Sequence, residues 1–308
     1  MHSNNQKTLK KKITLKGIGL HNGVIANLVI KPAEEDFGIN FCRVDIDKNK
    51  LIKANFKNVI EPILCTKIKS DNGITVSTVE HLMAAFFGEG IDNALVEIDA
   101  SEIPIFDGSA NEFVEAIRTA GLKDQSKNRK IIKTKKKVEI KEGEKYMSIE
   151  PNDNDLVVDF EIVFKNPLIR TRRKEFKLSS DNLTNIYNSR TFCLYEDIDF
   201  IKSQGLAKGG SLENAIVVKG SEILNDEGLR NRHEFVNHKI LDCLGDLMLS
   251  GHRIFGHVKT SQGGHALTNK LLLKFFSDPS NWSLEEAKTP EKNTQAQELH
   301  KKSLAASI

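Results

Sequence analysis

One histidine and two carboxylates share a spacing in the C-terminal half of the chain. His238, Asp242 and Asp246 are four residues apart in a pattern that predicts a long helix over residues 230–250. Four residues turn a helix by about 400°, so these side chains lie on one face. An imidazole and a carboxylate that point toward one position have the arrangement of metal ligands. An ordinary polar helix face shows the same spacing more often, so spacing alone leaves both interpretations open.

The adjacent His233-Glu234 pair does not make a zinc-protease motif. HExxH requires histidines four residues apart, whereas His233 and His238 are five apart. Five residues place the second side chain about 140° away from the first. We therefore expect His233 at the surface.

Glu80-His81 opens a second expected helix. Ser77-x-x-Glu80 is a capping box, and from the residues alone this structural role is the favoured interpretation of Glu80. The alternative is catalytic, because a carboxylate beside a metal-bound histidine is suited to act as general base for a water molecule.

His265 follows two glycines at the start of the last expected helix. The positive end of the helix dipole disfavours an imidazolium there. A catalytic acid at this position therefore needs a carboxylate partner, for which Asp246 is the candidate. A helix-capping histidine is the alternative.

The elements that must position these residues alternate between strands and helices. In the first half we expect strands at 26–32, 39–45, 64–77 (a hairpin turning at Asn72-Gly73) and 93–99, and helices at 77–88 and 110–120. In the second half we expect strands at 136–142, 145–151, 156–164 and 253–260, and helices at 230–250 and 264–276. Each half ends helix–strand–helix, which predicts two related α+β domains, each a β-sheet layered with helices on one face.

The domain limits follow from composition. A polar stretch at 121–137 suggests a boundary, giving an N-terminal domain over 1–126 and a C-terminal domain over 127–280. Residues 196–220 form a helix, a glycine-rich loop and a strand, a small βαβ-like insertion in the second domain. The charged residues from about Asp278 predict a frayed polar tail over 281–308.

Composition excludes several classes. Of 308 residues, 39% are hydrophobic and 28% charged, with a net charge of +3, so a globular protein without a polyanion partner is expected. The four cysteines are scattered, which argues against disulfides and suits a reducing compartment. The basic start lacks an apolar signal region, and no apolar run reaches the ~18 residues of a membrane span. We expect a soluble, cytoplasmic chain that binds no nucleic acid.

Several segments together carry a family resemblance. They are GIGLHNG (17–23), STVEHLMAAFFGEGIDNALVEI (77–98), EIPIFDGSA (102–110), SRTFCL (189–194), GLAKGGSLENAIVV (205–218), EFVNHKILDCLGDL (234–247) and GHALTNKLL (264–272). In this order, from about Gln6 to about Ser277, the chain resembles the UDP-3-O-acyl-N-acetylglucosamine deacetylases. These are zinc amidohydrolases of lipid A biosynthesis.

The resemblance implies a two-domain α+β sandwich with the active site between the domains. It implies zinc (Zn2+) as cofactor, held by His81, His238 and Asp242, with a fourth position open for water. It implies further that Glu80 is the general base, that Thr191 helps to hold the oxyanion, and that His265, kept cationic by Asp246, protonates the leaving amine.

The resemblance also implies where the acylated UDP-sugar binds. Lys239 and Phe192 would hold the sugar nucleotide. The insertion would form an apolar passage for the acyl chain, lined by Tyr195, Ile198, Ala207, Gly210, Ala215 and Val217. Two residues depart from the family pattern. Gln262 stands where some members have a lysine that binds the substrate diphosphate. Lys259 is a candidate to replace that lysine. Tyr195 is bulky for a residue at the mouth of the passage.

Two other functions are consistent with the same residues. A non-catalytic binding module for sugar nucleotides or nucleic acid would carry a structural metal or none, although structural sites usually have four protein ligands. A related amidohydrolase acting on another acylated sugar would share the fold but need no acyl passage. The deacetylase interpretation predicts a small-molecule substrate and a monomer.

Overall fold

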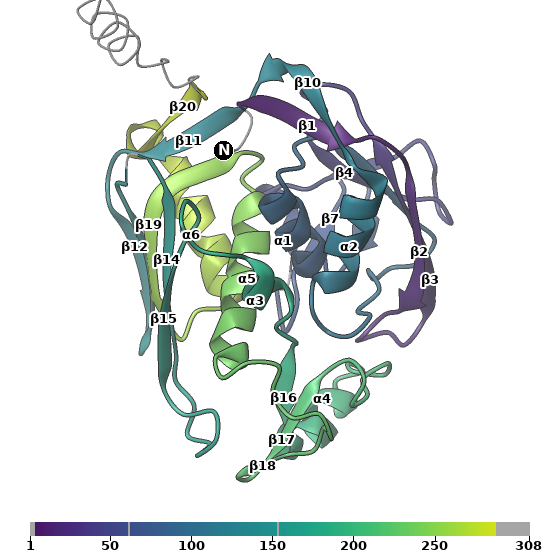
Figure 1. Ribbon diagram of the computed structural model, residues 1–308, viewed down its shortest axis with the longest axis vertical. Helices are drawn as coiled ribbons and strands as arrows, with labels where there is room; N and C mark the ends of the chain where they lie inside the picture. Colours follow the sequence, from purple (N-terminus) through teal and green to yellow (C-terminus); the bar gives the residue numbers. More distant parts are fainter. Residues whose placement is uncertain (1–3, 61, 153, 288–308) are drawn as a thin grey trace, which may run out of the picture.

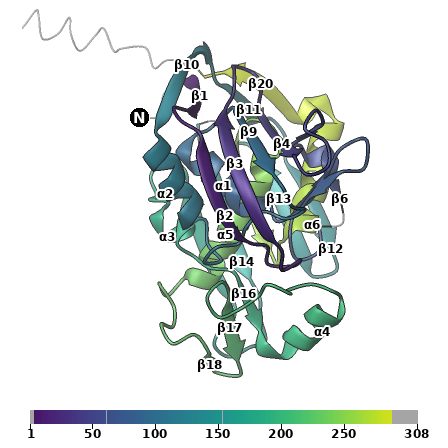
Figure 2. The same ribbon diagram turned by 90° about the vertical axis from the view of Figure 1, so that its right-hand side faces the viewer.

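The computed structural model describes residues 4–60, 62–152 and 154–287. Figure 1 shows two β-sheets on opposite sides of the molecule with the main helices between them. Figure 2, turned by 90°, shows the first sheet in front of these helices. Every described cysteine is a free thiol. The expected α+β class with two sheet-and-helix units is confirmed.

The first sheet has the strand order β2-β3-β9-β4-β5. Its strands are β2 (Ile13–Ile18), β3 (Ile25–Pro32), β4 (Ile39–Arg43), β5 (Leu51–Lys53) and β9 (Ala94–Ile98). Only the β4–β9 pair is parallel. Along β3 buried and more exposed residues alternate, as expected for a sheet that packs on helices with one face. A two-stranded pair and a small sheet flank it, made by β1 (Asn5–Leu9) with β10 (Leu122–Asn128), and by β6 (Val59–Ile60), β7 (Lys67–Lys69) and β8 (Thr75–Val76).

The second sheet repeats the pairing of the first. Its strands are β11 (Lys130–Thr134), β12 (Val138–Glu142), β13 (Lys145–Glu150), β14 (Leu156–Ile162), β15 (Arg172–Lys177), β19 (Arg253–Ser261) and β20 (Trp282–Glu286). Strand β12 pairs antiparallel with β13, β13 antiparallel with β19, β19 parallel with β14, and β14 antiparallel with β15. This is the order and direction of β2, β3, β9, β4 and β5. Because both halves share one topology, the expectation of two related units is confirmed.

The helices form a shared layer between the sheets. They are α1 (Glu80–Glu89), α2 (Asn111–Ala120), α3 (Thr184–Tyr187), α5 (Glu234–Met248) and α6 (His265–Ser277), with short 3-10 turns η1 (Phe56–Asn58) and η3 (Pro279–Asn281). Helices α1 and α5 pack on each other at the centre. Residues Glu80 to Gly88 of α1 are all buried, and so is nearly all of α5. A helix buried on all sides lacks a polar stripe, so the polar residues that these two helices do carry require a special reason.

The insertion projects from one end of the molecule in both views. It comprises β16 (Phe192–Leu194), the turn η2 (Tyr195–Asp197), α4 (Ile198–Ser203), β17 (Ile216–Lys219) and β18 (Glu222–Ile223). Strands β16 and β17 pair in parallel, with α4 and a glycine-containing loop in the connection between them. This is a βαβ arrangement.

One sequence interpretation gains detail and another requires correction. The polar segment 121–137 contains two strands: β10 pairs with β1, and after Arg129 the chain enters the second sheet as β11. The expected tail begins too early, because Trp282–Glu286 forms β20 against β11, and Trp282 packs on Phe276. Strand β20 lies at a sheet edge and ends in two glutamates, so its composition resembles that of a polar tail. The remainder of the expected tail, 288–308, lies outside the described residues.

Candidate active site

Three potential metal ligands converge where the two halves meet. His81 lies in the first turn of α1, and His238 and Asp242 lie one turn apart on α5. The Nε2 atoms of His81 and His238 are 3.6 and 3.4 Å from Oδ1 of Asp242. The two rings stand edge to face with centroids 5.0 Å apart. One ligand atom from each residue lies within 4.8 Å of the others, and all three residues are buried.

The electrostatics of this group suit a cation. Oδ1 of Asp242 is buried and has no hydrogen-bond partner among the residues that the structure describes, a costly state unless another group satisfies this atom. Burial lowers the pKa of His238 to about 3, which keeps the ring neutral with Nε2 available. Burial opposes the charge of Asp242, yet the ammonium of Lys239 beside it helps to hold the pKa of Asp242 well below the usual value. Two neutral imidazoles and a carboxylate fit a divalent metal such as zinc.

A glycine on α5 permits the approach that brings these ligands together. A Cβ atom at Gly245 would lie only 2.1 Å from the carbonyl oxygen of Glu80. The backbone of α5 therefore contacts the start of α1 directly, which only glycine allows. This close contact places Glu80 and His81 beside the ligand-bearing turn of α5.

The capping-box interpretation of Glu80 is wrong. Ser77 donates its hydroxyl to the carbonyl of Ser101, and no side chain caps α1. Thr78 has φ 57, a left-handed conformation that is rare for a β-branched residue and turns the chain just before the helix. Oε2 of Glu80 instead accepts a hydrogen bond from the backbone of Thr66, at 3.0 Å. The Glu80 side chain is therefore free of a capping role.

His265 lies opposite Glu80 and is held by Asp246. Its Nδ1 is 2.9 Å from Oδ2 of Asp246, and its Nε2 is 3.8 Å from Oε1 of Glu80. Asp246 lies one turn beyond Asp242 on α5, as the four-residue spacing predicts. The carboxylate partner expected for His265 is thus in place. Burial alone would lower the pKa of His265, but Asp246 and Glu80 raise it to about 9. Burial raises the pKa of Glu80 to about 6. The pair therefore combines an anionic base and a cationic acid near neutral pH.

A cavity of about 670 Å³ opens above these groups. His265, Thr191, Phe192 and Lys239 line it. Lys239 and His265 connect this lining to the ligand group, because they lie 2.9 and 4.0 Å from Oδ2 of Asp242. All the positions expected along the acyl passage also line it: Tyr195, Ile198, Ala207, Gly210, Ala215 and Val217. The walls made by the insertion are mostly aliphatic, which suits a hydrocarbon chain.

The polar lining residues are held from both halves. The Lys239 ammonium is 2.9 Å from Oδ2 of Asp242 and 5.7 Å from the centre of the Phe192 ring. Burial works against its charge, but Asp242 raises the pKa of Lys239. Thr191 donates its backbone N–H to Gly108 of the first half at 2.8 Å.

The two departures from the family pattern have different settings. Gln262 lines the cavity, whereas Lys259 does not and pairs with Glu150. The suggestion that Lys259 replaces the missing lysine is therefore not supported by its position. Tyr195 lines the cavity with 47% of its surface exposed, and Lys219 lies over its ring.

A second group of metal-type side chains is occupied by other contacts. Asp159, Glu175 and His257 lie on the neighbouring strands β14, β15 and β19. However, both carboxylate oxygens of Asp159 accept from the Arg173 guanidinium. Glu175 pairs with Lys177 at 3.1 Å. These contacts favour a solvated ion-pair cluster over a metal centre.

Two residues at the site were missed by sequence reasoning. Thr66 donates its backbone N–H to Glu80 and its hydroxyl to Oδ1 of Asp246, at 3.0 and 2.5 Å. His21 lines the cavity and is 8% exposed, and within the described part of the chain neither of its ring nitrogens has a hydrogen-bond partner. Thr66 gives no sequence signal, because its partners are distant in the chain. His21 lies in the GIGLHNG segment, whose glycines were the available signal.

Comparison with known proteins identifies the family. The family model described as UDP-3-O-acyl N-acetylglycosamine deacetylase matches residues 6–277. The chain belongs to this family. A UDP-3-O-acyl-N-acetylglucosamine deacetylase of Actinobacillus succinogenes is 42% identical over 280 residues, covering 90% of this chain and 92% of the relative. One from Geobacter sp. is 43% identical, covering 91% of each chain, and one from Psychrobacter sp. is 42% identical over 282 residues, covering 91% and 94%.

Membership makes this chain an enzyme, a deacetylase that hydrolyses an amide bond. The deacetylase family is a metalloenzyme family, and this chain has a candidate ligand set in His81, His238 and Asp242. Among the residues that the structure describes, no helix is long and apolar enough to cross a membrane.

Proposed function

We propose that this chain hydrolyses the N-acetyl group of a UDP-3-O-(3-hydroxyacyl)-N-acetylglucosamine. The products would be acetate and UDP-3-O-(3-hydroxyacyl)-glucosamine, in the committed step of lipid A biosynthesis. One observation carries the proposal: His265, which lines a largely aliphatic cavity, lies 3.8 Å from Glu80 and 4.0 Å from Asp242 of the buried ligand set. The names of the relatives, which specify this acylated sugar nucleotide, support it.

His81, His238 and Asp242 would hold zinc, with the fourth position left for water and substrate. Bound there, zinc supplies a Lewis acid that polarises the acetamide carbonyl and lowers the pKa of water. The buried and partnerless Oδ1 of Asp242 supports this role. The site matches a catalytic rather than a structural centre, because three protein ligands converge.

The remaining steps belong to this chain's own side chains. Glu80 would accept the proton of the water that attacks the carbonyl carbon. The Thr191 hydroxyl would donate to the oxygen on which negative charge develops. His265, protonated beside Asp246, would give its proton to the sugar nitrogen as the carbon–nitrogen bond breaks. Acetate and the free amine would then leave.

Lys239 and Phe192 would hold the sugar nucleotide, the lysine by charge and the phenylalanine by ring contact. The acyl chain would extend along the aliphatic walls formed by the insertion. A catalytic pocket for an unacylated sugar has no need of such walls. The aliphatic walls therefore favour the proposed substrate over the alternative of an amidohydrolase that acts on another sugar.

The test compares acylated and unacylated UDP-N-acetylglucosamine as substrates of the purified chain. We expect a large preference in kcat/KM for the 3-O-acylated form, measured by acetate release. Ala215→Trp, which fills the passage, should raise KM for the acylated substrate. Equal turnover of both substrates would contradict the proposed specificity.

A further inference from the structure

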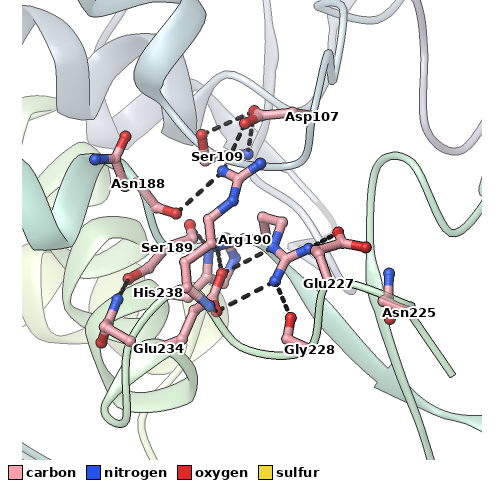
Figure 3. Close-up of polar contacts among 12 residues, drawn as sticks. Asp107, Ser109, Asn188, Ser189, Arg190, Asn225, Glu227, Gly228, Glu234 and His238 are labelled. Atoms are coloured by element: carbon pink, nitrogen blue, oxygen red, sulfur yellow. Dashed lines mark hydrogen bonds and ion pairs between the residues drawn. The ribbon is translucent and has the colours of Figure 1, made fainter. Parts of the chain in front are cut away.

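Arg190 is the largest side chain among those that the structure describes as fully buried, with 1% of its surface exposed. It lies just before Thr191, in the segment that leads from α3 to β16. Figure 3 shows its guanidinium at the centre of a polar network. A buried guanidinium is costly unless its donors are satisfied, so its partners define its role.

The main partner of Arg190 is Glu234, the first residue of α5. Nε of Arg190 is 2.9 Å from Oε1 of Glu234, and Nη2 is 3.3 Å from Oε2. The backbone N–H of Arg190 donates to the same carboxylate at 3.1 Å. Glu234 is wholly buried and also accepts from the backbone of Arg230 at 2.6 Å. Arg190 is therefore fixed to the start of the helix that carries the metal ligands.

The residue before Arg190 meets the same helix one turn later. The carbonyl of Ser189 is 3.0 Å from Nδ1 of His238. A carbonyl only accepts hydrogen bonds, so Nδ1 carries the hydrogen and Nε2 is left for the metal. Glu234 and His238 are four residues apart on one face of α5. Two consecutive residues of the segment thus meet two successive turns of the helix.

The far side of Arg190 contacts the segment that leads from β18 of the insertion into α5. Nη2 donates to the carbonyl of Gly228 at 2.6 Å, and Nη1 pairs with Glu227. A second arginine, Arg230, extends the network to the first half, because it donates to Asp107 at 2.7 Å and to the carbonyl of Asn188 at 3.2 Å. The segment 188–191 is thereby held between α5, the insertion and the first half.

We propose that Arg190 is a positioning residue for the metal centre: it holds the Ser189 carbonyl against His238 and the Thr191 hydroxyl at the cavity wall. The proposal rests on the proposed function, since it requires a metal at His81, His238 and Asp242. Loss of the Arg190–Glu234 contacts would allow the segment to move away from α5. The His238 ring would then lose the acceptor that fixes its orientation.

The test uses Arg190→Met and the milder Glu234→Gln, which keeps the shape of the carboxylate but removes its charge. Zinc affinity of the folded chain is measured by competition with a chromophoric chelator, and ligand geometry by the visible spectrum of the cobalt-substituted protein. We expect zinc affinity to fall about 10–100-fold in Arg190→Met, as is typical when a residue supporting a ligand is lost. Arg190→Lys should restore part of it, and the cobalt spectrum should change.

The matched control is Arg129→Met. Arg129 is also buried, and its Nε and Nη2 lie 2.8 and 2.7 Å from the carboxylate of Asp92. It donates a further hydrogen bond to the carbonyl of Gly90 at 2.9 Å. Unlike Arg190, it lies where the chain passes from the first half to the second sheet. Arg129→Met should lower the melting temperature and leave zinc affinity and the cobalt spectrum unchanged.

Arg190 would be merely structural if its variants matched Arg129→Met, with lower melting temperature but wild-type metal affinity and spectrum. If Arg190→Met does not fold, the same comparison with Glu234→Gln decides the matter. A wild-type chain that binds neither zinc nor cobalt tightly would overturn the metal centre and this role together. A wild-type chain that binds metal but releases no acetate would count against the proposed function alone.

Discussion

Thr66 contacts both members of the proposed acid–base pair. Its backbone donates to Glu80, and its hydroxyl lies 2.5 Å from Asp246 and 3.1 Å from Nδ1 of His265. The hydroxyl has one hydrogen, and it donates that hydrogen in a bond to the carboxylate of Asp246, which can only accept. Thr66 therefore orients Asp246 toward His265 while leaving the imidazole hydrogen to the same carboxylate.

Thr66→Val keeps the shape and the backbone bond but removes the hydroxyl. A hydrogen bond to a charged group contributes about 1.5–3 kcal/mol, so we expect kcat to fall about 10–100-fold. Steady-state kinetics measure this, with Thr66→Ser expected to recover most of the loss. The control is Thr8→Val, which removes a buried hydroxyl bonded to the Asn93 carbonyl at 2.7 Å, far from the site. An equal loss in the control variant would rule out a specific role for Thr66.

The pH dependence of kcat/KM belongs to the same residues. Glu80 must be ionised to accept a proton, and its pKa is raised to about 6, so activity should rise as pH increases through that region. His265 must be protonated, and its pKa is raised to about 9, so activity should fall as pH increases through that value. Asp246→Asn removes the charge that supports the imidazolium. Its basic limb should move to lower pH, and an unmoved limb would contradict the role assigned to Asp246.

At the scale of elements, two buried helices that come from different halves carry the proposed metal ligands, and a third helix, α6, adds His265. The apolar surroundings of α1 and α5 are required by burial between two sheets, so their few polar residues stand out. The close contact at Gly245 sets how these helices cross. The insertion adds the cavity wall without supplying any of the proposed metal ligands or the acid–base pair.

Gly245→Ala should destabilise the protein despite the higher helix propensity of alanine, about 1 kcal/mol. The added methyl would meet the Glu80 carbonyl at 2.1 Å, and overpacking of this kind costs about 1–3 kcal/mol. Urea unfolding would measure the loss, and turnover should fall as Glu80 is displaced. Thr119→Ala, at an exposed position of α2, gains propensity without a clash and should not destabilise. A Gly245→Ala variant as stable and active as wild type would contradict the close-contact account.

The sequence predicted those parts of the site that depend on local spacing. His238, Asp242 and Asp246 are aligned by helical periodicity, and the main helices and the central strands of both sheets follow from hydrophobic patterning. The strands β2, β11 and β15 were not predicted. The contacts of Thr66 could not be predicted, because 180 residues separate it from Asp246. The capping box at Ser77 matched a local rule that the left-handed turn at Thr78 overrides. β20 was missed because its charged residues lie at a sheet edge.

At the scale of the molecule, duplication explains why the site lies where it does. The two halves share a strand order and pack their helical layers together, so the start of α1 meets the C-terminal half of α5 at the centre. One proposed ligand comes from the first half and two from the second. A metal bound there would link the halves and stabilise the folded state, by about 2.7 kcal/mol at a concentration one hundred times its Kd.

The most direct measurement follows acetate release from the 3-O-acylated substrate after exhaustive chelation and after one equivalent of zinc is restored. Glu80→Ala is measured in parallel. The account predicts that chelation abolishes turnover and lowers the melting temperature, and that zinc restores both. It also predicts that Glu80→Ala binds zinc but turns over at least about 100-fold more slowly, because general-base catalysis contributes about 100–10,000-fold to the rate. Full turnover by the metal-free chain, or by Glu80→Ala, would contradict it.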